Sequence, residues 1–234
     1  MNLLQVDIKE AGYYDYKKAV KNIRFSLEKG KIVGLIGPNG AGKSTIIKSI
    51  VKIIPHFIGT IEFYNRPPRF TYIPEQPIFY DELTLWEHLE VAAAAYELDE
   101  KLFFADSEKL LASFQLTKHK HQFPGTFSKG MQQKAMLIMS LLIKPDIYII
   151  DEPFVGLDPR AVLRFLQILN LEKTRGAGIL ISTHQLDTAE RVCDSIILIS
   201  EGQIAIEGSL TEIQTACNLT GASLFDCFNA LLEQ

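Results

Sequence analysis

One run of residues has the types and spacing of a loop that binds phosphate groups. It matches the pattern GxxxxGK[ST] and lies directly after the apolar run Ile32–Ile36 and before a helical pattern. Gly37, Gly40 and Gly42 let the backbone turn its N–H groups inward, and the helix N-terminus favours an anion. Its lysine is expected to reach the β- and γ-phosphates and its serine to ligate magnesium, which a chance glycine turn would not do. The residues are Gly37, Pro38, Asn39, Gly40, Ala41, Gly42, Lys43, Ser44 and Thr45.

Two acids, Asp151 and Glu152, follow the apolar run Ile147–Ile150. Because open parallel sheets bind ligands at the carboxyl ends of their strands, both acids are expected to meet the phosphates. Asp151 is suited to hold Mg²⁺ through water, and Glu152 to polarise the water that attacks the γ-phosphate. The pair could instead cap the next helix, since Pro153 follows it. Together with the glycine loop, the pair favours ATP hydrolysis.

A third motif, Phe127–Lys134, reads Phe-Ser-Lys-Gly-Met-Gln-Gln-Lys and lies shortly before the Asp-Glu strand. It resembles the signature motif of the ABC ATPase family, whose usual form is LSGGQ followed by a polar residue and a base. Ser128 and Gly130 match this form, whereas Lys129 and Met131 depart from it. The Ser-Lys-Gly-Met version is similar to that of ABC-2-type exporter ATPases. Independently of the resemblance, Ser128 is a good helix N-cap, and the helix dipole favours an anion.

The resemblance implies that this helix start faces the γ-phosphate bound to a second ATPase domain, so that two ATP molecules are sandwiched in a head-to-tail dimer. It also implies roles for two later residues. His184, just past the apolar run Ile179–Ile181, would contact the γ-phosphate. Asp158 would lie in the family's D-loop, which crosses the dimer interface, and it also fits a helix N-cap before Pro159.

Two further assignments stay open between neighbouring residues. The resemblance places Tyr14 where the family stacks an aromatic ring on adenine, with Tyr13 and Tyr16 as nearby candidates. At the family's Q-loop, Glu75 stands at the aligned position and Gln76 follows one place later. Either side chain could accept a hydrogen bond from magnesium-bound water. We favour Glu75 because it is the aligned residue.

Apolar runs that alternate with helical patterns favour an α/β fold with a mostly parallel sheet covered on both faces. The runs Leu3–Ile8 and Ile23–Leu27 alternate apolar and polar residues and are expected in an antiparallel side sheet. A helix is expected over about Lys43–Ile54, stopped by Pro55. The stretch Leu83–Phe114 reads as mostly helical. Further helices are expected from Ser128 to about Ile143 and from Pro159 onward.

The resemblance covers residues 3 to about 208 and implies a P-loop NTPase core. It predicts a single ABC ATPase domain over residues 1–234. In this division, residues 1–80 and 145–208 form the RecA-like core and the β side sheet. Residues 81–144 form a helical subdomain with the signature motif, and residues 209–234 form C-terminal helices.

Composition narrows the partners that we expect. A net charge of −4 offers no broad basic field, so nucleic acid is not an expected partner. The longest apolar run, Ala135–Ile143, is far shorter than the roughly 20 residues of a membrane span. The first residues lack the pattern of a secretory signal, so we expect a cytosolic protein. Neither cysteines nor histidines have the spacing of a metal site, and a solvated surface is expected for His56, His88, His119 and His121.

These observations predict the ATP-binding and ATP-hydrolysing subunit of an ABC transporter, with ATP and Mg²⁺ as ligands. The expected partners are a membrane-spanning permease, on whose cytoplasmic side the chain would sit, and a second ATPase domain in a homo- or heterodimer. Export is favoured by the Ser-Lys-Gly-Met motif. The alternatives are an ABC ATPase of DNA repair, chromosome organisation or translation, which usually carries a coiled-coil insertion or a second ATPase domain, and a P-loop kinase.

Overall fold

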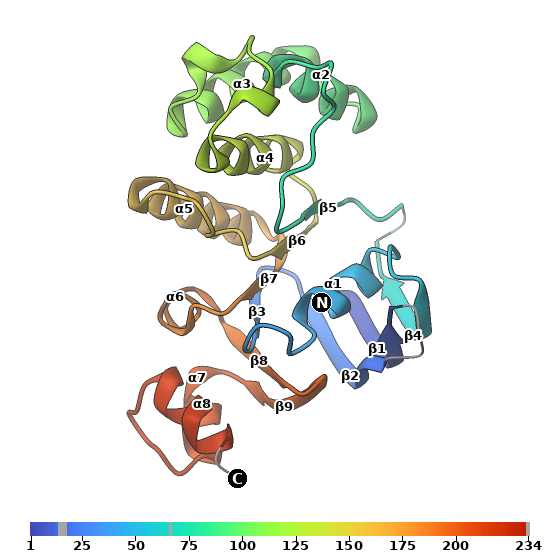
Figure 1. Ribbon diagram of the computed structural model, residues 1–234, viewed down its shortest axis with the longest axis vertical. Helices are drawn as coiled ribbons and strands as arrows, with labels where there is room; N and C mark the ends of the chain where they lie inside the picture. The colour runs from blue at the N-terminus through green and yellow to red at the C-terminus, as the bar shows by residue number, and fades with distance from the viewer. Residues whose placement is uncertain (14–17, 66, 233–234) are drawn as a thin grey trace.

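The computed structural model describes residues 1–13, 18–65 and 67–232 of the chain. Its strands form two sheets, and the helices α2, α3 and α4 gather at one end of the molecule, away from the side sheet of β1, β2 and β4 (Figure 1). The C-terminal helices lie at the opposite end from α2–α4 (Figure 1). The predicted fold class is confirmed.

The larger sheet has six strands in the order β5-β6-β7-β3-β8-β9. All neighbouring strands pair in parallel except β8 and β9, which are antiparallel. Since parallel strands end at the same edge, the segments after β3, β5, β6 and β7 are brought together. The strands are β3 (Ile32–Ile36), β5 (Phe70–Ile73), β6 (Ile147–Asp151), β7 (Gly178–Thr183), β8 (Ser195–Ser200) and β9 (Gln203–Gly208).

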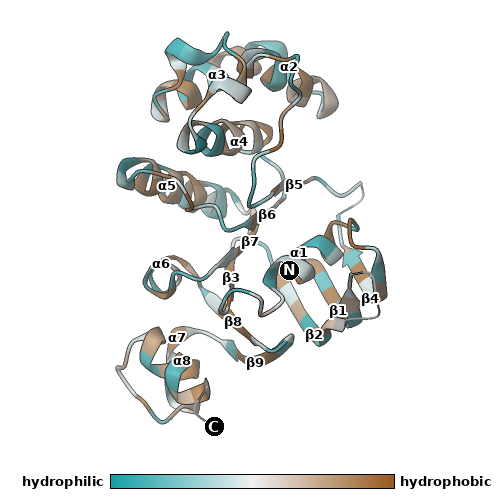
Figure 2. Cartoon of the chain, viewed as in Figure 1, coloured by the Kyte–Doolittle hydropathy of each residue, from teal (hydrophilic) through white to brown (hydrophobic). Residues whose placement is uncertain are grey.

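Both faces of this sheet are covered, as its continuous apolar strands predict. Tyr148 and Ile150 of β6 pack into a core cluster with the helices on one face. Ile147 and Ile149, which alternate with them, pack into a second cluster with α1 and the side sheet. Figure 2 shows hydrophobic brown along β8, whereas the strands of the side sheet change between brown and teal.

The side sheet is antiparallel, with the order β2-β1-β4. Its two N-terminal strands confirm the prediction, although both extend beyond the predicted ends. The third strand, β4, and the edge strands β5 and β9 were not predicted. The strands are β1 (Asn2–Gly12), β2 (Lys18–Glu28) and β4 (His56–Phe63).

The helical predictions are confirmed for the segment after residue 83 and for the helices that start at Ser128 and Pro159. Ser128 is the N-cap of α4, and its Oγ accepts a hydrogen bond from the Met131 N–H at 3.3 Å. The helices are α2 (Leu85–Ala95), α3 (Glu100–Ser113), α4 (Lys129–Ile143), α5 (Pro159–Arg175), α6 (Leu186–Val192), α7 (Leu210–Ala216) and α8 (Leu224–Leu232), with short 3₁₀ turns η1 (Thr117–His119) and η2 (Pro124–Thr126).

The predicted helix over Lys43–Ile54 is too long. Helix α1 spans Lys43–Ile50, because Lys52 adopts a left-handed conformation with φ 59°. The Ile53 N–H then donates to the Lys48 carbonyl at 3.0 Å, a bond that closes the helix end. The helix therefore ends before Pro55 rather than because of it.

The prediction that His88 lies on the solvated surface is wrong. Its side chain is 2% exposed, on the inner face of α2. Nε2 accepts a hydrogen bond from the Tyr80 N–H at 2.9 Å, so Nδ1, at 2.8 Å from the Thr84 carbonyl, carries the proton. This histidine fixes the chain entering α2.

Within the described residues, no helix has both the length and the apolar composition needed to span a bilayer. The longest described helix, α5, has 17 residues.

Candidate nucleotide site

The glycine-rich loop connects β3 to α1 and closes around its own lysine. Gly42 has φ 110°, and a Cβ at this position would collide with the Val20 side chain. Only glycine fits there without strain. Lys43 is 5% exposed, and its Nζ donates to the carbonyls of Gly37 at 2.8 Å and Pro38 at 3.2 Å. The loop thus holds a buried ammonium group at the start of a helix.

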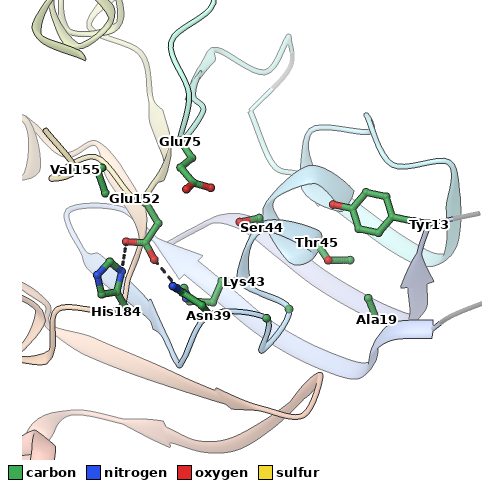
Figure 3. A pocket seen from close by; sticks show the side chains of 12 residues that line it. Tyr13, Ala19, Asn39, Lys43, Ser44, Thr45, Glu75, Glu152, Val155 and His184 are labelled. Carbon is green, nitrogen blue, oxygen red and sulfur yellow. Dashed lines mark hydrogen bonds and ion pairs between the residues drawn. The ribbon is translucent and has the colours of Figure 1, made fainter. Parts of the chain in front are cut away.

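Lys43 also meets the acid at the end of β6. Its Nζ lies 3.3 Å from Glu152 Oε1, while Glu152 Oε2 lies 2.9 Å from His184 Nδ1 (Figure 3). Because an ionised carboxylate only accepts hydrogen bonds, Nδ1 donates the proton in this contact. Glu152 Oε1 is buried and accepts no hydrogen bond of standard geometry, so its polar contact is the ion pair with Lys43. Residues from three separate elements therefore converge on one carboxylate.

The backbone of Glu152 is strained. Its φ of 47° lies in the left-handed region, which costs about 1–3 kcal/mol for a residue with a side chain. Ser182 of β7 stabilises this conformation, because the Glu152 N–H donates to its Oγ at 3.0 Å and to its carbonyl at 3.2 Å. The same hydroxyl donates to Asp151 Oδ1 at 2.5 Å. Ser182 thus fixes both predicted acids.

The site is rich in carboxylates. Asp151 is 1% exposed. Burial, followed by the negative charge of Asp151, raises the pKa of the nearby Tyr72 phenol to about 12; the charges of Tyr13 and Glu75 contribute less. Such a region attracts a cation. In the described part of the chain, no group of three or more His, Cys, Asp or Glu residues could hold a metal alone.

The residues present nevertheless fit Mg²⁺. This ion prefers oxygen ligands and is usually held by one or two carboxylates together with substrate phosphates and water. Ser44 and Glu75 supply a hydroxyl and a carboxylate at the cavity, and the carboxylate of Glu152 lines the same cavity.

A cavity of about 600 Å³ lies over the glycine loop, within the size range of small-molecule sites. Of the predicted residues it includes Asn39, Gly40, Gly42, Lys43, Ser44, Thr45, Glu75, Glu152 and His184. Predicted residues that do not line it are Gly37, Pro38, Ala41, Gln76, Asp151, Ser128, Gly130 and Asp158. Of the two alternatives at the Q-loop position, Glu75 lines the cavity and Gln76 does not.

Two lining residues, Ala19 and Val155, were not predicted, whereas Tyr13 was one of the candidates named beside Tyr14. Tyr13 lies at the end of the cavity formed by the side sheet, with its hydroxyl 3.3 Å from Lys48 Nζ (Figure 3). The predicted Tyr14 and its alternative Tyr16 lie outside the described residues.

The signature-motif residues form a second arrangement, outside the cavity of their own chain. A Cβ on Gly130 would lie 2.5 Å from the Gly156 carbonyl oxygen, so the start of α4 packs closely on the loop before α5. Asp158 caps α5 by accepting from the Ala161 N–H at 2.9 Å. Its pKa is lowered, chiefly by the hydrogen bond from Lys134 at 2.5 Å.

Comparisons with known proteins agree with this geometry. The family described as "ABC transporter" matches residues 20–155. The ABC transporter ATP-binding protein YthP of Bacillus subtilis strain 168 is 49% identical over 97% of this chain and 95% of its own length. EcsA of the same strain, an ABC-type transporter ATP-binding protein, is 42% identical over 100% and 98%. A solved ATP-binding subunit of an ABC transporter superposes with a TM-score of 0.92 at 42% identity, covering 98% of this chain and 99% of that one.

Proposed function

This chain belongs to the ABC transporter family of ATP-binding proteins, and we propose that it hydrolyses Mg·ATP to energise a separate membrane-spanning permease. The observation that carries the proposal is the contact series from Lys43 through Glu152 to His184, at the floor of the cavity. Phosphoryl transfer to water uses a phosphate-binding lysine and a residue that orients the attacking water, and Lys43 and Glu152 can supply these two parts.

The γ-phosphate of ATP would replace the Glu152 carboxylate as the partner of Lys43. Glu152 then accepts a proton from a water molecule as the water oxygen bonds to the γ-phosphorus. The bond from that phosphorus to the bridging oxygen breaks, and ADP leaves with the bridging oxygen. His184, which donates to Glu152 in the resting site, contacts the γ-phosphate and keeps the carboxylate oriented.

Magnesium would supply positive charge that stabilises the phosphate oxygens during transfer. Ser44, Asp151 and Glu75 are the residues that would hold it. The loop residues Gly37–Thr45 bind the phosphates. Tyr13 lines the cavity and is a candidate for the adenine platform beside the predicted Tyr14.

The working unit is a dimer of ATPase domains, formed with an identical or a related chain. Ser128 and Gly130 start α4 outside their own cavity, where an N-terminal helix end is free to meet the γ-phosphate bound to the second domain. Asp158 lies beside them and crosses the same interface. Residues 81–144 carry this surface as one helical subdomain within a single ATPase domain.

The permease places the chain at the cytoplasmic face of the membrane. The direction of transport is export, by the resemblance of Ser128–Met131 to exporter ATPases.

The test is steady-state release of phosphate from ATP with magnesium. Glu152→Gln should lower kcat by about 10²- to 10⁴-fold, the usual contribution of a general base. The matched control is Glu62→Gln, because Glu62 is exposed on β4 away from the cavity. If Glu152→Gln turns over ATP at the wild-type rate, or if both variants lose the same share of kcat, Glu152 is not the general base.

A further inference from the structure

A buried amide on α4 contacts the chain immediately after Glu152. Gln133 is 2% exposed, and its Nε2 donates to the Pro153 carbonyl at 3.2 Å. A buried amide is costly unless it is hydrogen bonded, so this contact fixes the position of the Pro153 peptide group relative to the helix. Pro153 is the residue that follows Glu152.

Glu152 is therefore anchored on both sides. Before it, the N–H is held by Ser182 of β7 at 3.0 Å, and after it the Pro153 carbonyl is held by Gln133 of α4. A left-handed backbone at a glutamate persists only where its surroundings fix it. The hydrogen bond from Gln133 supplies the second of the two anchors.

The same helix turn is attached further along this loop. Gly130 packs on the Gly156 carbonyl, and Lys134 pairs with Asp158 Oδ2 at 2.5 Å. Lys134 keeps only 13% of its side chain exposed, so this pair is well shielded on the lysine side. The first turns of α4 and the loop between β6 and α5 thus form one packed unit.

We propose that Gln133 is a positioning residue for Glu152: it holds the acid in its left-handed conformation and ties it to the start of α4, where Ser128 lies. This rests on the proposed function, since it assigns Glu152 the role of base. Gln133 itself touches no substrate.

The experiment is a double-mutant cycle on kcat with Gln133→Met, which keeps the side-chain length and removes the donor. In the wild-type background, Gln133→Met should lower kcat by about 10- to 100-fold, as a displaced catalytic group does, with KM for ATP changed less than about twofold. In the Glu152→Gln background, the same substitution should have almost no further effect on kcat, because the group it positions is gone.

The control is Ser140→Ala, which removes another buried hydrogen bond from α4, the one from Ser140 Oγ to Thr71 Oγ1 at 2.7 Å. It should match the loss of thermal stability in Gln133→Met while keeping wild-type kcat. Three results would overturn the proposal. In the first two, Gln133→Met lowers kcat equally in both backgrounds, or lowers kcat no more than Ser140→Ala does. The third result is a Gln133→Met variant that loses affinity for ATP while its kcat stays at the wild-type value. If the wild type hydrolyses no ATP, the proposed function itself fails, which is a different result.

Discussion

The resting contact between Lys43 and Glu152 predicts that Glu152→Gln binds ATP more tightly than the wild type. The γ-phosphate can pair with Lys43 only after the Glu152 carboxylate has left it. Replacing the carboxylate by a neutral amide removes this competitor, and it removes the repulsion between a nearby carboxylate and the phosphate.

The geometry sets the size of the effect. The two charged atoms lie 3.3 Å apart, on side chains that are 5% and 8% exposed. At an effective dielectric constant of about 20, their attraction is about 5 kcal/mol. Desolvation of both ions offsets part of this, and Lys43 keeps its hydrogen bonds to Gly37 and Pro38. We expect a net gain of about 1.4 to 2.8 kcal/mol, which is about 10- to 100-fold in Kd.

The assay is calorimetric titration with ATP in the absence of magnesium, so that no hydrolysis occurs. ADP is the internal control, because it lacks the γ-phosphate and should gain less. Glu62→Gln should bind both nucleotides like the wild type. The reasoning is refuted if Glu152→Gln and the wild type bind ATP with equal affinity. It is also refuted if the substitution raises the affinity for ADP as much as the affinity for ATP.

Two further predictions concern the structure around the site. Burial, followed by the charge of Asp194, raises the pKa of the Cys193 thiol to about 12. At pH 8, iodoacetamide should therefore leave Cys193 unmodified until the protein is unfolded. Mass spectrometry of the peptide that contains Cys193 measures this, and rapid modification of the native protein would contradict it. Gly34→Ala should destabilise the fold by about 1–3 kcal/mol, because the new methyl would lie 2.7 Å from Cys193 Sγ. Urea unfolding should show that the double variant Gly34→Ala, Cys193→Ala recovers part of the lost free energy of unfolding. If it recovers none, the new methyl is not crowded by Cys193.

Much of this fold could be predicted because local patterns agreed with tertiary structure. Ile147–Ile150 is apolar throughout since both faces of its strand are buried. Ser128 and Asp158 cap helices as their residue types predict. The strands β4, β5 and β9 were missed because β4 and β9 hold no fully buried residue and β5 has only four residues, so none of them gives the continuous apolar run of a buried strand.

Other features depend on contacts between distant segments. The apolar spacing of Val51 and Ile54 suggested a longer α1, whereas Lys52 turns left-handed and leaves Ile53 58% exposed. His88 falls between Leu85 and Leu89, so the helical pattern contained a signal for burial. Its bond to the Tyr80 backbone could not be inferred from spacing.

The candidate site was predicted by residue type but not in its resting arrangement. Lys43 was expected to bind phosphate and Glu152 to polarise water, and nothing in their separate motifs indicated that they contact each other. Gln133 carried no signal for its contact with Pro153, because that contact joins segments 20 residues apart.

The most direct test of the central claim is a single-turnover experiment with γ-labelled ATP, magnesium and excess protein. With bound nucleotide in both cases, the wild type should release labelled phosphate, while Glu152→Gln should retain intact ATP. Release of phosphate at the same rate by both proteins would contradict the account.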